Sequence, residues 1–163
     1  IIFIFVLIMI DGTYRILYIK WEGVYLPIGC LTSDSFTETS EMMNTTTRDN
    51  AGWTTSTPVN QSYSISFEGL LMNTEFEGGD STKLSYDRLR ILKRSRTLIE
   101  WKIADSEDLF IDLGKGYINS LSDSSNIDEF ISFSVEIEGY GKPESYSAYT
   151  VNNSLQKELQ YEL

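Results

Sequence analysis

Alternation of apolar and polar residues with a period of two places the strongest limit on how this 163-residue chain can fold. Apolar side chains take every second position within residues 63–67, 99–103, 109–113 and 131–137. Because successive side chains of a strand point to opposite faces of a sheet, this spacing predicts strands with one buried and one wet face. The segment Arg15–Trp21, rich in aromatic and β-branched residues, predicts a further strand. We therefore expect a mainly β fold, an antiparallel β-sandwich.

One helix is expected to flank the sandwich. Ser85 is suited to the N-cap, Asp87 lies in the first turn, and Leu89 and Leu92 share one face. Cations follow where they suit the negative end of the helix dipole: Lys93, Arg94 and Arg96.

A long polar segment interrupts the alternating pattern. Residues 32–41 carry one apolar side chain, Phe36, and residues 42–60 are rich in Asn, Thr, Gly and Pro around Trp53. We expect a strand that runs out into a long hairpin loop and returns at Ser62. Loops of this length are uncommon in compact domains and tend to be functional or held by a partner. A segment so poor in apolar side chains is expected to be held by other copies of the chain.

The residue types present exclude most enzyme chemistries. The chain has no His and one Cys, Cys30, which removes His-based triads, Cys–His dyads, His/Cys zinc sites and an intramolecular disulfide. The acids at Asp105, Glu107, Asp108 and Asp112 do not have the spacing of a calcium loop. We expect no enzymatic activity, no metal and no cofactor.

Two glycine-containing stretches could suggest a nucleotide site. Gly114-Lys115-Gly116 and Gly139-Tyr140-Gly141-Lys142 both lack the remaining positions of a phosphate-binding loop or a dinucleotide fingerprint. We therefore expect both to be turns, with the preceding strand ending at the first of them.

Charge is segregated along the chain. The formal net charge is −11, yet residues 83–102 carry seven cations and two acids, a net of +5. This basic stretch is interpreted as a solvated helix face or as a surface that meets an acidic surface of another copy. Nucleic-acid binding is disfavoured, because the stretch is short and surrounded by opposite charge.

The wet faces of two predicted strands carry small or acidic side chains and no cation. They are formed by Ser62, Ser64, Ser66, Glu68, Ser132, Ser134, Glu136 and Glu138. Such faces suit an ordinary solvated sheet, and they equally suit the wall of a channel through which a polyanion slides. Without Lys or Arg, the counterion release that would bind the polyanion is absent.

The two ends of the chain differ from the middle. Residues 1–10 form an apolar run that is too short for a spanning helix. It is interpreted either as an extension ahead of a start at Met9 or as a buried first strand. We expect one domain over residues 11–142, followed by a polar C-terminal tail over residues 143–163.

Two stretches carry a resemblance to a known family. Residues 41–53 read EMMNTTTRDNAGW, and residues 63–70 read YSISFEGL. A strand leading into a Thr-rich turn with a basic–acidic pair and Gly-Trp, followed by a Ser-rich strand ending in Phe-x-Gly, resembles the major tail tube proteins of long-tailed, non-contractile bacteriophages. The order downstream is also similar, with a short helix, a Trp-containing strand and a last strand at residues 131–141. The resemblance covers residues 24–142.

The resemblance implies a structural virion protein of the phage tail. Its β-sandwich would assemble into hexameric rings that stack into a tube, with inner strands joining into one β-barrel around the bore. The expected partners are other copies, the tape measure protein and tail-end proteins. Genomic DNA would pass without specific binding, and no membrane is involved.

The resemblance and the residue patterns together nominate three groups of residues. Arg48, Asp49 and Trp53 are candidates for contacts between subunits or rings. The basic residues Arg88, Arg90 and Arg94 are candidates for contact with an acidic neighbour. Glu68, Glu136 and Glu138 are candidates for the lumen wall. The alternative function is a monomeric β-sandwich module that binds carbohydrate or a receptor, with Trp53 and neighbouring polar residues as its platform. Trp21, Trp53 and Trp101 together would suit a sugar-binding platform, but Trp101 lies on the apolar face of its strand and is expected in the core.

Overall fold

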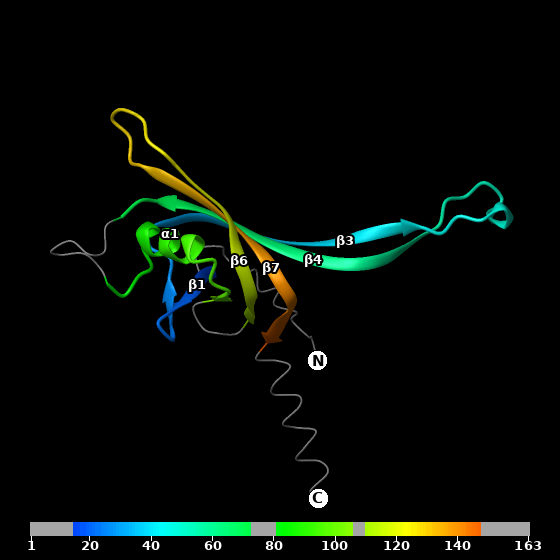
Figure 1. The fold of residues 1–163 in the computed structure, drawn as a ribbon, viewed down its shortest axis with the longest axis horizontal. Coiled ribbons are helices and arrows are strands. Elements are labelled where there is room, and N and C mark those ends of the chain that lie inside the picture. Colours follow the sequence, from blue (N-terminus) through cyan, green and yellow to red (C-terminus); the bar gives the residue numbers. More distant parts are fainter. Residues whose placement is uncertain (1–14, 73–80, 106–109, 148–163) are drawn as a thin grey trace, which may run out of the picture.

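The computed structural model describes residues 15–72, 81–105 and 110–147 (Figure 1). The apolar run at residues 1–10 and residues 148–163 of the polar C-terminal tail lie outside these ranges, and so do the expectations for them. Glu107 and Asp108 of the acidic cluster also lie outside them. Of the described residues, no helix is long and apolar enough to span a membrane.

The described chain forms one antiparallel sheet and one α-helix, which confirms the expected mainly β class. The strands follow the order β2-β1-β5-β6-β7-β4-β3 across the sheet, and each neighbouring pair is antiparallel. The elements are β1 (Arg15–Trp21), β2 (Val24–Pro27), β3 (Leu31–Asn44), β4 (Ser56–Leu70), α1 (Tyr86–Arg94), β5 (Ile99–Asp105), β6 (Phe110–Ser124) and β7 (Ser132–Ser147).

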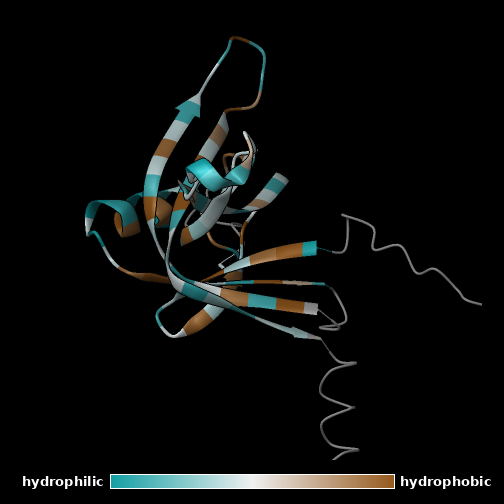
Figure 2. Ribbon diagram, turned by 90° about the vertical axis from the view of Figure 1, so that its right-hand side faces the viewer, coloured by the Kyte–Doolittle hydropathy of each residue, from teal (hydrophilic) through white to brown (hydrophobic). Residues whose placement is uncertain are grey.

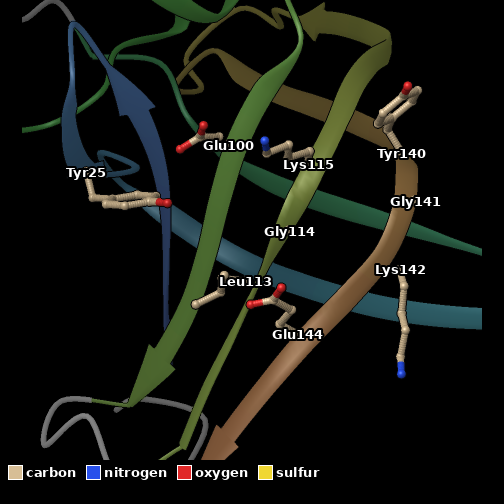
Figure 3. A pocket seen from close by; sticks show the side chains of 9 residues that line it. All are labelled: Tyr25, Glu100, Leu113, Gly114, Lys115, Tyr140, Gly141, Lys142 and Glu144. Atoms are coloured by element: carbon tan, nitrogen blue, oxygen red, sulfur yellow. The ribbon is translucent and has the colours of Figure 1, made fainter.

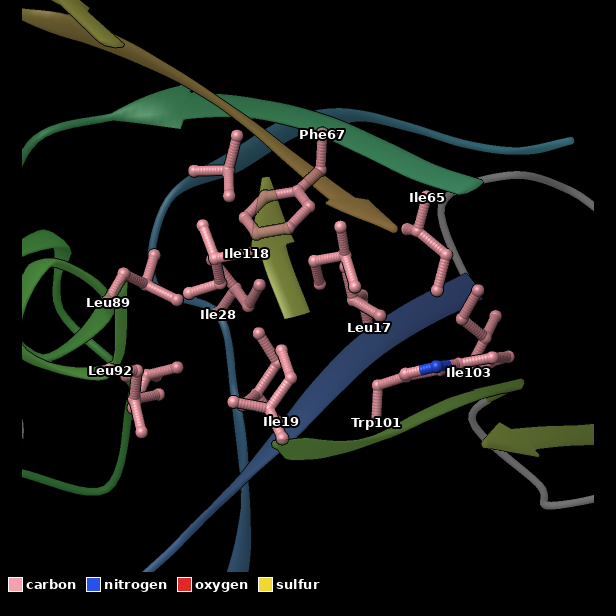
Figure 4. Packing of buried hydrophobic residues seen from close by; sticks show 14 of the residues in the cluster. Leu17, Ile19, Ile28, Ile65, Phe67, Leu89, Leu92, Trp101, Ile103 and Ile118 are labelled. Carbon is pink, nitrogen blue, oxygen red and sulfur yellow. The ribbon is translucent and has the colours of Figure 1, made fainter. Parts of the chain in front are cut away.

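The sheet is bent so that its two halves face each other across the core. Ile65 and Phe67 of β4 point toward Leu17 and Ile19 of β1 (Figure 4). Hydrophobic and hydrophilic bands alternate along the strands, as the period of two predicts (Figure 2). The two layers of the expected sandwich belong to a single sheet, because β6 pairs with β5 in its first half and with β7 along its length.

Glycines inside β6 and β7 lie within continuous strands, so the prediction that they form turns is wrong. Gly116 of β6 pairs with Gly139 of β7 in the middle of the two strands. A Cβ on Gly139 would lie 2.5 Å from ring atoms of Tyr63, and one on Gly114 would lie 2.8 Å from the ring of Trp101. The glycines are therefore needed for close approach of aromatic rings to backbone.

Tyr63 ties the two layers at this point. Its hydroxyl donates a hydrogen bond to the backbone carbonyl of Lys115 in β6. Its ring centroid lies 5.6 Å from those of Phe36 and Trp101, so aromatic side chains of β3, β4 and β5 meet over the glycines. Such pairs add to the stability that burial alone provides.

Strands β3 and β4 extend further than the sequence predicts. Residues 42–60 were expected to lie in a loop, but β3 reaches Asn44 and β4 begins at Ser56, so the connection is residues 45–55. The ladder is supported by polar cross-strand contacts, such as Asn60 Nδ2 donating to Glu41 Oε2 at 2.8 Å. This two-stranded ribbon, residues 37–62, is called the arm and projects far from the body (Figure 1).

The helix forms where it is predicted. Ser85 is the N-cap and its Oγ accepts from the backbone N–H of Arg88 at 3.5 Å, while Tyr86, Leu89 and Leu92 are buried. At the other end of the chain, β7 runs on to Ser147, beyond the domain boundary that we place at residue 142. That boundary stays a prediction.

Gly139→Ala tests whether the bend depends on the close approach of Tyr63. The added Cβ collides with a buried ring, so we expect the free energy of unfolding to fall by about 1–3 kcal/mol. Urea denaturation followed by circular dichroism measures this change. Gly29→Ala is the control, because its Cβ meets the flexible side chain of Met72. Equal losses in the two variants would contradict the role given to Gly139.

Candidate functional site

The three acidic residues nominated for a lumen share one face of the sheet. The register sets Ser66 opposite Glu136, Ser64 opposite Glu138, and Glu68 opposite Ser134. Their strand neighbours, including Ile65 and Phe67, are buried in the core, so these side chains point to the outside.

This acidic face extends across four strands. β3 adds small polar side chains opposite β4, and β6 adds them opposite β7. Its members are Ser33, Ser35, Thr37, Ser64, Ser66, Glu68, Ser120, Ser122, Ser134, Glu136 and Glu138. Tyr117 lies opposite Glu138, and the next row brings Lys115 opposite Tyr140, where the acidic face ends. From the row that contains Glu68 and Ser134 to the row that contains Glu138 and Tyr117, the described residues of this face include no cation.

Both outer edges of this four-stranded layer are open in the single chain. β5 pairs with β6 only as far as Gly116, so the part of β6 from Tyr117 to Ser124 has no strand on that side among the described residues. At the far edge, β3 pairs with β4 alone. Unpaired strand edges expose backbone donors and acceptors that another chain can satisfy.

The arm ends in a turn organised by its own hydrogen bonds. Thr45 N–H donates to the Thr55 carbonyl at 2.9 Å, and Asn50 Nδ2 donates to Thr55 Oγ1 at 3.1 Å. Gly52 adopts φ +84°, a left-handed conformation that glycine accepts without strain. Residues 45–55 are called the arm tip.

The structure brings Arg48, Asp49 and Trp53 together on the arm tip. All three side chains are exposed, and neither Arg48 nor Asp49 forms an ion pair with another described residue. A large aromatic ring and a cation are therefore presented at the end of a long projection, away from the core.

Two of the three nominated arginines of the basic helix already contact side chains of the same chain. The guanidinium of Arg88 lies 5.7 Å from the centre of the Trp21 ring, and that of Arg90 lies 4.8 Å from the Tyr86 ring. Arg90 Nη1 also lies 3.5 Å from an oxygen of Asp87. Arg94 alone of the three nominated arginines is exposed with no interaction among the described residues.

Contacts of α1 also hold it against β6. Lys93 Nζ donates to the carbonyl of Asn119 at 2.7 Å, and Tyr86 Oη donates to Asp123 Oδ1 at 2.7 Å. Burial raises the pKa of Tyr86 above its ordinary value, and the hydrogen bond to Asp123 raises it further. The helix is thereby positioned beside the open edge of β6.

A shallow hollow lies beyond the acidic face (Figure 3). It is lined by Tyr25, Glu100, Leu113, Gly114, Lys115, Tyr140, Gly141, Lys142 and Glu144. Lys20 Nζ lies 2.7 Å from Glu100 Oε2. The hydrogen bond lowers the pKa of Glu100 and raises that of Lys20. Glu100 is therefore already paired within the chain, and the other charged side chains that line the hollow are Lys115, Lys142 and Glu144. No metal-binding cluster of His, Cys, Asp or Glu occurs within the described ranges.

The three tryptophans do not share a surface. Trp101 is fully buried, Trp21 is half-buried beneath Arg88, and Trp53 lies at the arm tip. A platform shared by the three tryptophans is therefore wrong, and the burial of Trp101 confirms its expected place in the core.

Sequence reasoning missed one exposed feature. The turn between β6 and β7, residues 125–131, carries the apolar side chains Ile127 and Phe130 on the surface. The sequence pattern that could have identified them is a pair of large apolar side chains in a polar, Ser- and Asn-containing turn. Trp53 was nominated because it also lies in a polar segment. This turn is called the hairpin tip.

An open-edged sheet, a projecting arm and exposed apolar tips together describe a structural subunit built for assembly. A family model described as phage tail tube protein matches residues 9–145. The chain belongs to the phage tail tube protein family.

Solved structures share the fold at low sequence identity. The tail of an empty gene transfer agent (GTA) particle, computed with C6 symmetry, is 18% identical with a TM-score of 0.69, covering 85% of this chain and 100% of that one. The SPP1 tail tube is 11% identical with a TM-score of 0.67, covering 85% and 80%. The baseplate of the anti-feeding prophage is 10% identical with a TM-score of 0.55, covering 82% and 92%. A comparison with curated protein sequences finds no match.

Tyr86→Phe tests how firmly α1 is held on β6. A hydrogen bond to a charged acceptor is worth about 1.5–3 kcal/mol, and we expect the free energy of unfolding to fall by roughly the lower value at neutral pH. Because the folded state raises the pKa of Tyr86 above 10.0, this contribution is complete below pH 10.0 and is lost as the pH rises through the folded-state pKa.

The control for this prediction is Tyr146→Phe, since Tyr146 donates to Glu144 at 2.6 Å on an exposed surface. Urea denaturation of both variants at neutral and alkaline pH measures the difference. An equal loss in the two variants at neutral pH would show that the link between α1 and β6 contributes no more stability than an exposed hydrogen bond.

Proposed function

We propose that this protein is a non-enzymatic subunit of a phage tail tube, in which hexameric rings stack into a conduit for DNA. Family membership and a neighbouring tail fold of C6 symmetry support this function. The observation that carries it is the arm: every described residue from 37 to 49 and from 51 to 62 is exposed. A two-stranded ribbon without a buried face is marginally stable alone, so it is completed by neighbouring copies.

Ring closure follows from the open edges of the four-stranded layer. In the proposed ring, the free edge of β3 in one copy pairs with the free edge of β6, from Tyr117 to Ser124, in the next. Each copy then contributes β3, β4, β7 and part of β6 to one barrel. Closure satisfies the backbone groups that both edges leave open, and it removes the hazard of uncontrolled edge pairing.

The acidic face would line the bore of this barrel. Glu68, Glu136 and Glu138 would face the passing DNA together with the serines and threonines between them. A wall of this composition repels phosphate and offers no cations for counterion release, so DNA moves without being held. This arrangement accounts for an acid-rich face on a sheet whose other face is packed.

The remaining nominated residues would contact neighbours. Arg48, Asp49 and Trp53 at the arm tip would be buried on another copy, and Arg94 would face an acidic surface, with Arg88 and Arg90 bordering it. The tape measure protein and tail-end proteins are the further proposed partners, at the bore and at the end of the tube.

Electron microscopy of the purified protein tests the assembly. We expect negatively stained rings or tubes with a central hole. Trp53→Ala should retain the circular dichroism spectrum of the folded chain but lose most of its tubes, because a large aromatic anchor is removed. Val24→Ala, another exposed apolar truncation, is the control and should assemble normally. Monodisperse monomers that retain glycan would overturn the tube, and a full yield from Trp53→Ala would overturn the contact.

Reversing charge on the acidic face tests the lumen. Tubes of Glu136→Lys with Glu138→Lys should bind short duplex DNA at low salt, because added cations release counterions from phosphate. Co-sedimentation measures binding, and a nuclease distinguishes DNA in the bore, which is protected. Glu22→Lys with Glu144→Lys adds equal charge at exposed positions elsewhere, and DNA bound there should be digested. Digestion of the DNA in both cases would remove Glu136 and Glu138 from the lumen.

A further inference from the structure

The hairpin tip exposes apolar side chains that the fold does not cover. Ile127 is 92% exposed and Phe130 is 83% exposed, the highest values among the large apolar side chains described. Two hydrogen bonds hold this turn, one between side chains within it and one from its end to the residue that follows β4. Asn126 Nδ2 donates to Glu129 Oε2 at 2.7 Å, and Leu71 N–H donates to the Ile131 carbonyl at 2.8 Å. Paired, exposed apolar side chains on an ordered turn are typical of an interaction site.

The arm tip offers a matching surface at the other end of the molecule. Trp53 is 79% exposed there and lies next to Gly52 in the turn. Figure 1 shows the two tips projecting from the body in different directions, with the whole length of the arm between them. They cannot meet within one chain. A contact between two copies would join unlike surfaces, which is the type of contact that propagates into rings or stacks.

The charges of the two tips are complementary. Arg48 is the only cation between residues 33 and 62, and it is placed on the arm tip. The hairpin tip carries Asp128 and Glu129 between Ile127 and Phe130 and has no cation. Asp49, like-charged with the hairpin tip, would lie at the border of such a contact. Complementary charges of this kind fix the register between partners.

We infer that the arm tip of one copy docks on the hairpin tip of a second copy. Trp53 covers Ile127 and Phe130, and Arg48 faces Asp128 and Glu129. The inference rests on the proposed function, because it requires an assembly of identical chains. It adds to that function the surface of a second copy that receives the arm tip.

Cross-linking tests the placement without removing any contact residue. In a Cys30→Ser background, chains with Thr54→Cys and chains with Ser125→Cys are mixed, assembled and treated with a flexible thiol cross-linker. We expect cross-linked dimers that contain one chain of each kind, identified by mass spectrometry. Val24→Cys replaces Thr54→Cys in the control and should yield none.

A charge exchange tests the pairing of Arg48. Arg48→Glu and Glu129→Arg should each reduce the yield of tubes by about tenfold or more, and a chain carrying both should recover it. Lys142→Glu, an equal change at another exposed position, should assemble normally. The docking would be overturned if tubes assemble but no dimer cross-linked between Thr54→Cys and Ser125→Cys chains is found. It would also be overturned if the double charge variant fails to assemble although each single variant is folded. Failure of the unmodified protein to assemble would instead overturn the proposed function.

Discussion

The contact between the Tyr63 ring and the glycines of β6 and β7 is the interaction on which the architecture depends. It allows both strands to keep pairing through a sharp bend, since Gly139 has no Cβ to separate the layers. The hydroxyl group bonds to the carbonyl of Lys115, so the ring is anchored at both ends. Bends of this kind need glycines at defined positions. One continuous sheet can therefore supply a packed inner face and an unbroken outer face.

Tyr63 also marks where the body ends and the arm begins. It is the first buried residue of β4, and every residue of that strand before it is exposed. The core thus holds one end of a strand whose other end has no core of its own. Because the strand is continuous across this point, the packed sheet fixes where the arm leaves the body. The exposed length beyond Tyr63 has no core of its own, and in the proposed ring the neighbouring copies would hold it.

The sequence predicted the strands of the core, the helix and its cap, because each depends on local spacing. It predicted that Glu136 and Glu138 share a face, but only the register with β4 brings Glu68 beside them. The glycine stretches were misinterpreted, because their need for glycine arises from distant rings rather than from a turn. Strands in the arm were taken for a loop for a related reason. They bury nothing, so hydrophobic alternation, the signal that identifies a strand, is missing there.

In the proposed tube, the surfaces that would bind other copies are separate from the acidic face that would line the bore. Bringing the acids of several copies around one bore costs electrostatic free energy, and that cost rises with every Glu on the acidic face. In the proposed ring, backbone pairing between the open edges of β3 and β6 would offset that cost without adding a charge. Such pairing is poorly selective, since any exposed strand can take part. Selectivity would then come from side chains outside the proposed bore. The arm tip with Trp53 and the hairpin tip with Phe130 project away from the acidic face and would supply it there.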